Sequence, residues 1–201
     1  MRRAPSLLQT ALFAPAPRVL AEDAEGGVVY RPAVVDEVTQ RRWFQTLREA
    51  VRWQAQRRPM YDRVVDVPRL TASFWLDDSK LPDALAEAAT AVRAAVGAPF
   101  NAVGLNFYRD GRDSVAPHRD KLHMLVPGQP IAVLSLGSPR RMTLRRMGRG
   151  ARVDFVDLEP GSLFVMCQAS QFVYEHGIPR TDEPVGPRIS CAFRVRPRGE
   201  H

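Results

Sequence analysis

The chain has 201 residues, of which 45% are hydrophobic, and a formal net charge of +7. This length fits one domain with a sizeable core, and no stretch approaches the roughly 18 to 20 consecutive apolar residues of a membrane-spanning helix. The positive charge favours a polyanionic partner, nucleic acid first, although an arginine-rich composition is equally typical of a GC-rich genome.

Residues 1–27 carry prolines, acids and a Gly-Gly pair, and we expect an N-terminal arm there, followed by a single domain over residues 28–201. A short strand is expected over residues 28–30. Residues 36–54 have apolar side chains at helical spacing, with Asp36 as a candidate N-cap. The predicted apolar face of this helix consists of Val38, Trp43, Phe44, Leu47 and Val51, with Gln54 as a further candidate.

A turn is expected at residues 57–59, and a β-prone alternating pattern predicts a strand over residues 69–76. Residues 82–96 form the second helical pattern. Pro82 suits its first turn and Gly97 its C-terminal end.

After Pro99 the pattern changes to short apolar runs separated by turns. Strands are expected over residues 101–108, 131–136, 141–146, 152–157, 162–167, 171–175 and 188–195. Two helices followed by many short strands are typical of an α+β fold. A double-sheet jelly roll, with the helices bracing one sheet, fits this order best.

The two cysteines, Cys167 and Cys191, lie in apolar stretches and have no zinc-binding spacing. We interpret both as buried small hydrophobic residues. So few thiols indicate a reducing cytoplasmic location rather than a disulfide scaffold. The first residues resemble a signal peptide only faintly, because prolines interrupt their apolar run. We expect a cytoplasmic monomer without a membrane anchor.

Two of the four histidines suit a metal site. His118 and Asp120 form an HxD unit, and His176 follows at the end of a later apolar run. In an extended segment residues i and i+2 point the same way, so His118 and Asp120 can converge on one ion. Two imidazoles and a carboxylate can occupy one face of an octahedral iron and leave the other face open. The HxD unit alone is also compatible with a hydrogen-bonded surface histidine, and we interpret His123 as a rim or structural residue.

The last predicted strand carries two arginines, Arg188 and Arg194, on the same face as Ser190. At about 3.3 Å per residue these arginines are roughly 20 Å apart, so the strand would have to curve or the side chains lean together to meet one ligand. A solvated pair on an edge strand is the alternative, which the apolar residues of the opposite face disfavour. Asn106 and Tyr108 likewise share one face of the strand predicted over residues 101–108.

These motifs together resemble the AlkB family over roughly residues 60–197, which we expect to be the catalytic core. The matching segments are Pro68–Thr71, Phe100–Asn101, Asn106–Gly111, Asp113–Val115, His118–Asp120, Ile131–Gly137, Arg140, Gly161–Met166, Gln171, His176–Pro179 and Arg188–Arg194. The resemblance implies a double-stranded β-helix dioxygenase that uses Fe(II), 2-oxoglutarate and O2. It implies oxidative dealkylation of N-alkylated bases in DNA or RNA, a repair reaction for which a duplex base would have to be flipped out of its stack.

The resemblance also implies a role for particular residues. The implied metal ligands are His118, Asp120 and His176. The implied 2-oxoglutarate contacts are Asn106, Tyr108, Arg188, Ser190 and Arg194. Arg188 would pair with the distal carboxylate, since a guanidinium suits a carboxylate as a two-pronged donor. Arg194 would lie near the end that chelates iron.

Two departures from the family pattern concern the substrate. Repair members carry an acidic residue two positions after the aspartate of the HxD unit, where this chain has Leu122. The segment between Trp75 and Pro82, part of the lid over the nucleotide in repair members, is short here. Phe74 and Trp75 remain candidates for stacking on a base, and Arg69 is a further candidate substrate contact. The arginine-rich run over residues 140–149 suits either a phosphate backbone or a solvated hairpin face.

Two alternatives to base repair therefore stand. Leu122 and the short lid favour a hydroxylase or demethylase of a protein or small molecule. A nucleic-acid-binding relative without activity is the other alternative, and the intact set of metal and 2-oxoglutarate residues argues against it.

Overall fold

The computed structural model describes residues 15–60, 63–148 and 153–198. Its larger sheet contains β1 (Arg18–Ala21), β2 (Val28–Arg31), β3 (Gln54–Met60), β4 (Arg63–Trp75), β5 (Ala102–Tyr108), β7 (Ile131–Gly137), β10 (Leu163–Met166) and β12 (Arg188–Arg194). Its smaller sheet contains β6 (Val115–His118), β8 (Arg140–Arg146), β9 (Val153–Leu158) and β11 (Tyr174–Ile178). The helices are α1 (Glu37–Ala50), α2 (Asp83–Val96) and the short α3 (Gln168–Gln171), with a 3-10 turn, η1, at Leu122–Met124.

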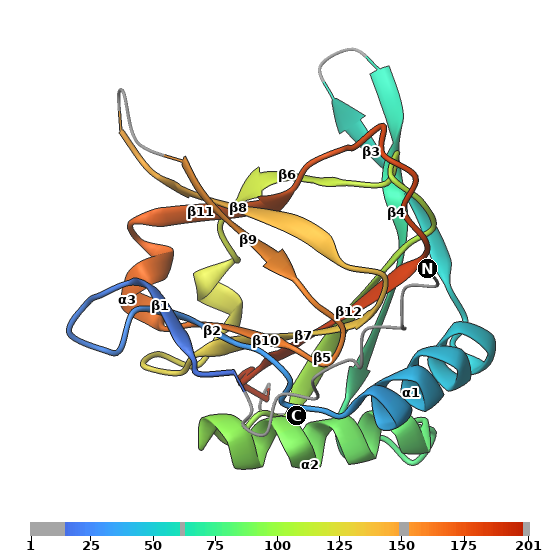
Figure 1. Cartoon of the computed structure of the whole chain (residues 1–201), viewed down its shortest axis with the longest axis horizontal. Coiled ribbons are helices and arrows are strands. Elements are labelled where there is room, and N and C mark those ends of the chain that lie inside the picture. Colours follow the sequence, from blue (N-terminus) through green and yellow to red (C-terminus); the bar gives the residue numbers. More distant parts are fainter. Residues whose placement is uncertain (1–14, 61–62, 149–152, 199–201) are drawn as a thin grey trace, which may run out of the picture.

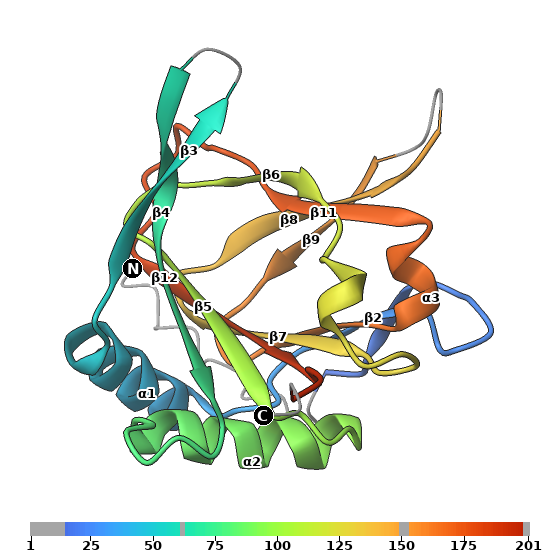
Figure 2. The same ribbon diagram turned by 180° about the vertical axis from the view of Figure 1, so that it is seen from behind.

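The two sheets face each other as the layers of a jelly roll, and α1 and α2 cover the outer side of the larger sheet (Figures 1 and 2). The larger sheet has the order β1-β2-β10-β7-β12-β5-β4-β3, and the smaller sheet has the order β6-β11-β8-β9. All of these strand pairs are antiparallel. The expected fold class, with helices bracing one sheet, is confirmed.

The central strand β12 separates two layers of core. Ile189, Cys191 and Phe193 pack with the helices, whereas Ala192 belongs to the core between the sheets. Because side chains alternate along a strand, a strand buried on both faces presents one set to each layer. The same alternation directs Arg188 and Ser190 into the space between the sheets. Both cysteines are buried, as expected, and burial raises the pKa of the Cys191 thiol to about 12.

Helix α1 begins at the expected cap, since the Asp36 carboxylate accepts a hydrogen bond of 2.9 Å from the backbone N–H of Thr39. Trp43 and Leu47 are buried, but Val38 is 78% exposed, so its assignment to the apolar face was wrong. The helix instead turns Gln40 inward, where its Oε1 accepts from the backbone N–H of Gly137. Val38 lies two residues earlier, about 200° around the helix from Gln40.

Three local predictions also need correction. Residues 57–59 lie within β3 rather than in a turn, because β3 and β4 form a long hairpin that extends beyond the rest of the sheet (Figure 1). Residues 168–171 form α3, so the strand expected over residues 171–175 starts only at Tyr174. Strand β6 was not predicted, and β1 lies inside the segment expected to be an arm. In the described part of the chain, no helix is both long and apolar enough to cross a membrane.

The turn between β1 and β2 is tied to the start of α3 through Asp23. Its carboxylate accepts hydrogen bonds from Cys167 Sγ, at 2.9 and 3.1 Å, and from Ser170 Oγ at 2.5 Å. It also accepts from the backbone N–H groups of Glu25 and Gly27. Burial by itself would raise the pKa of Asp23, but these donors hold it at about 2, against an ordinary value of 3.8.

Truncation of one core side chain of α1 tests the packing of this helix on the sheet. We expect Leu47→Ala to lower the free energy of unfolding by about 2–5 kcal/mol, because it leaves a cavity in the core. Val38→Ala, in the same helix, should change that free energy by no more than about 0.5 kcal/mol. Urea unfolding of both variants measures the difference, and equal effects would contradict this placement of α1.

The Asp23 contacts predict a pH-dependent stability. A carboxyl whose folded pKa is depressed contributes stability above its unfolded pKa and loses it as the pH falls through the folded value. We therefore expect wild type to exceed Asp23→Asn in stability at neutral pH, and this excess to shrink between about pH 4 and 2. Urea unfolding of both proteins across that range measures it; an excess that does not change with pH would show that the contacts are absent.

Candidate active site

His118 and His176 are brought together by the pairing of β6 with β11. The two residues are Cα partners in this antiparallel ladder, and their ring centroids are 4.6 Å apart. Asp120 follows two residues after the end of β6. One ligand atom from each of these three residues lies within 4.8 Å of the others. This geometry fits two imidazoles and one carboxylate on one face of a metal ion.

The two imidazoles are in different surroundings. His118 is partly exposed, and its Nδ1 lies 3.0 Å from the carbonyl oxygen of Ala116. Because a carbonyl oxygen can only accept, Nδ1 is the donor in this contact, and the lone pair of Nε2 is available to coordinate a metal. His176 is buried, and burial, with the charge of His118, lowers its pKa to about 4. Among the described residues its Nδ1 has no hydrogen-bond partner. A neutral imidazole beside a carboxylate suits a metal ion.

The third residue of the cluster, Asp120, divides its two oxygens between two partners. Oδ2 accepts from Arg194 Nε at 2.8 Å, and Oδ1 lies 3.9 Å from His118 Nε2. Burial would raise the pKa of Asp120, but the charge of Arg194, followed by that of His176, keeps it below its usual value. The carboxylate therefore stays ionised with one oxygen directed to the cluster.

At the opposite end of the site, Arg188 is a buried cation. It is 1% exposed, and its Nη2 donates to Ser135 Oγ at 2.9 Å. Its guanidinium carbon lies 5.1 Å from the centre of the Tyr108 ring. Within the described chain its Nε and Nη1 have no acceptor. Because a buried guanidinium is costly without an anionic partner, these two donors fit a carboxylate ligand.

A cavity of about 370 Å³ connects the two ends of the site. All five residues expected to contact 2-oxoglutarate line this cavity: Asn106, Tyr108, Arg188, Ser190 and Arg194. His118 and His176 line it as well. The long distance between the two arginines has a simple explanation, because Arg194 braces the Asp120 end while Arg188 lies at the other.

The candidate substrate residues separate into two groups. Arg69 lines the cavity and holds Asn106, since its Nε donates to Asn106 Oδ1 at 2.7 Å. Phe74, Trp75 and Leu122 do not line it. Phe74 packs on the core beneath the helices, and Leu122, in η1, packs on the core between the sheets. Trp75 is 39% exposed at the end of β4, with the guanidinium of Arg198 5.8 Å from its ring centre.

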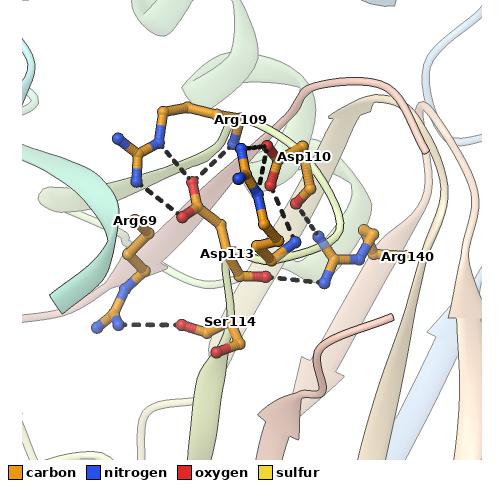
Figure 3. Close-up of polar contacts among 7 residues, drawn as sticks. Arg69, Arg109, Asp110, Asp113, Ser114 and Arg140 are labelled. Atoms are coloured by element: carbon orange, nitrogen blue, oxygen red, sulfur yellow. Dashed lines mark hydrogen bonds and ion pairs between the residues drawn. The ribbon is translucent and has the colours of Figure 1, made fainter. Parts of the chain in front are cut away.

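The loop that leads from β5 into β6 is held by residues whose roles were not apparent from the sequence (Figure 3). Arg140 is buried, and its guanidinium donates to the carbonyl oxygens of Asp110, Asp113 and Pro179. The Asp113 carboxylate accepts from Arg109 through two bonds of 2.8 Å. The carbonyl oxygen of Ser114, next to β6, accepts from Arg69. These contacts fix the approach of the chain to His118.

Three arginines of the arginine-rich run have partners within the protein, whereas Arg146 is exposed. Besides the buried Arg140, Arg141 pairs with Asp157 and Arg145 pairs with Glu175. Arg149 lies outside the described residues. The side chains of Arg141 and Arg145 are about half exposed, so this hairpin face is solvated.

Comparison with known proteins agrees with this geometry. Residues 27–194 match the family model described as the 2OG-Fe(II) oxygenase superfamily. The chain belongs to this superfamily. Its cofactors are therefore Fe(II), 2-oxoglutarate and O2, and the cluster of two histidines and one aspartate provides residues that can hold the metal.

The relatives are AlkB-like, as the motifs indicated. "DNA oxidative demethylase ALKBH2" of Homo sapiens is 33% identical over 110 residues, which cover 51% of this chain and 42% of ALKBH2. "Alpha-ketoglutarate-dependent dioxygenase alkB homolog 3" of Bos taurus is 27% identical over 224 residues, with 94% and 77% covered. The chain thus matches less than half of the length of ALKBH2. The solved structure of OsALKBH1 shares the fold, with a TM-score of 0.63 at 16% identity over 84% of this chain and 97% of that one.

Replacement of Arg188 separates a ligand-binding arginine from a structural one. We expect Arg188→Met to weaken 2-oxoglutarate binding by about 10- to 100-fold, since a hydrogen bond to a charged group contributes about 1.5–3 kcal/mol. The ligand-free protein should lose no stability, because the change removes a buried cation that lacks an anionic partner. Isothermal titration with 2-oxoglutarate and Mn(II) measures the first effect and thermal unfolding the second.

The exposed Arg141→Met serves as the control and should leave 2-oxoglutarate binding unchanged. An Arg188→Met protein that binds 2-oxoglutarate normally would exclude this residue from the cosubstrate site.

Proposed function

We propose that this protein is an Fe(II)- and 2-oxoglutarate-dependent demethylase of N-alkylated bases in DNA or RNA. The observation that carries the proposal is one cavity, lined at one end by His118 and His176 of the metal cluster and at the other by the buried Arg188. Among the described residues, Nε and Nη1 of this arginine have no acceptor. The name of the relative ALKBH2, a DNA oxidative demethylase, supports nucleic acid as the substrate class.

Different residues of the cavity would contact different parts of 2-oxoglutarate. Arg188 would hold the distal carboxylate of 2-oxoglutarate, with Tyr108 against the guanidinium. Asn106, oriented by Arg69 and in contact with Ser190 Oγ at 3.4 Å, would hydrogen-bond the cosubstrate nearer to the metal. Arg194 keeps the Asp120 carboxylate ionised and oriented.

When bound, the iron supplies the activation of O2 that oxidises 2-oxoglutarate to succinate and CO2 and hydroxylates a substrate C–H bond. The substrate has access from the His118 side, where 43% of that side chain is exposed. Gln56, Thr71 and Arg196 also line the cavity and are polar, which suits the edge of a base or a phosphate. A hydroxylated N-methyl group releases formaldehyde and leaves the unmodified base.

A second candidate is a hydroxylase of a protein or small molecule. Leu122 favours it, because this side chain accepts no hydrogen bond and packs on the core between the sheets. The short segment between β4 and α2 favours it too, since it leaves Trp75 outside the cavity.

An assay on methylated oligonucleotides tests the proposal. Purified protein with Fe(II), 2-oxoglutarate, ascorbate and air should remove methyl groups from single strands that carry 1-methyladenine or 3-methylcytosine, with matching succinate. His118→Ala should lower the rate by at least about 100-fold, because even the outer partners of a metal ligand contribute about 10–100-fold. His123→Ala, which removes a histidine outside the cluster, should keep the wild-type rate of demethylation. Mass spectrometry follows both products.

Two other outcomes would point to a different function. Succinate without loss of methyl groups would favour the protein or small-molecule hydroxylase. No succinate from the wild-type protein would contradict the dioxygenase.

A further inference from the structure

Gln171 is fully buried beside the metal cluster without lining the cavity. It is the last residue of α3, and its Oε1 accepts a hydrogen bond of 3.2 Å from the backbone N–H of Asp120. We propose that Gln171 is a positioning residue, which holds the backbone of Asp120 so that the carboxylate reaches the metal. The inference rests on the proposed role of Asp120 as a metal ligand.

Asp120 needs such support because it lies outside the strand that carries His118. Strand β6 ends at His118, so the ladder with β11 fixes the histidine but not the aspartate. The side chain of Asp120 is held at Oδ2 by Arg194, and its backbone is held by Gln171. Two fixed points restrict the remaining oxygen, Oδ1, to the side of His118.

Helix α3, which carries Gln171, has only four residues. A helix of this length is not stable alone. The turn between β1 and β2 anchors it: Asp23 accepts from Cys167 and Ser170, and Glu25 Oε2 accepts from the backbone N–H of Ala169 at 2.8 Å. The chain then leads from Gln171 directly into β11 and His176. One anchored segment therefore supports two of the three cluster residues.

A purely structural role explains Gln171 less well. A buried amide is costly unless its polar atoms are paired, and in the described chain Nε2 of Gln171 has no acceptor. An apolar side chain of similar size would fill the same volume without that cost. The hydrogen bond to Asp120 is the contact that accounts for a glutamine at this position.

Metal binding by three variants tests the inference without turnover. Mn(II) serves as the probe, and its affinity for metal-free protein is measured by electron paramagnetic resonance of the free ion. Gln171→Met leaves the Asp120 N–H unpaired and should raise the Kd by about 10-fold, the lower end of the range for outer partners of metal ligands. Gln171→Glu keeps an oxygen acceptor and should restore most of the affinity.

The matched control is Gln168→Met. Gln168 lies in the same helix, and its Oε1 accepts from the backbone N–H of Gly128, which adjoins no metal ligand. This variant should bind Mn(II) like wild type. The visible spectrum of the Co(II)-substituted proteins should change only in Gln171→Met, since a loss of stability alone does not alter ligand geometry in folded protein.

The outcomes test the role of Gln171 independently of the proposed substrate. Wild-type affinity and an unchanged Co(II) spectrum in Gln171→Met would overturn it, as would an equal loss in Gln168→Met. If Gln171→Met does not fold, Gln171→Asn takes its place, because its side chain is one methylene shorter. A Mn(II) affinity of Gln171→Asn equal to that of Gln171→Glu would then overturn the inference. Wild-type protein that binds Mn(II) but removes no methyl group would contradict the proposed substrate and leave the role of Gln171 intact.

Discussion

The register between β6 and β11 is the constraint on which the site depends. It places His118 beside His176 on adjacent strands of the smaller sheet, so that two residues far apart in the chain come within reach of one metal ion. Because side chains alternate along a strand, a slip of one residue would turn His176 to the other face. The Arg140 contacts to the loop before β6 and the anchoring of α3 before β11 hold the two strands in this register.

The site also retains buried polar atoms that the fold leaves unpaired. In the described chain these include Nε and Nη1 of Arg188, Nδ1 of His176 and Nε2 of Gln171. Each is costly in a protein core, where nearly all polar groups have a partner. Arg188 and His176 both line the cavity, where a bound dicarboxylate and a metal would supply interactions that folding alone does not. The ligand-free protein therefore trades some stability for a preorganised site.

Sequence patterns correctly predicted the features that neighbouring residues determine. The cap at Asp36, the left-handed Gly97 after α2 and the alternation of β12 between two core layers depend on neighbouring residues, and all three are present. Predictions failed where distant partners decide. Val38 is exposed because the sheet selects another face of α1, and residues 168–171 are helical because Asp23 and Glu25 hold their N-terminal end.

The sequence by itself determined the jelly-roll class, the family and the set of residues that could form the site, because the order and spacing of motifs can be compared without knowing any contacts. It could not separate Arg69, which lines the cavity, from Phe74 and Leu122, which pack on the core. Nor could it predict the hydrogen bond between Gln171 and Asp120, which joins two segments that only the tertiary structure brings together. Strand pairing and burial decided the placement of these side chains and the contact of Gln171, because they act between residues remote in the chain.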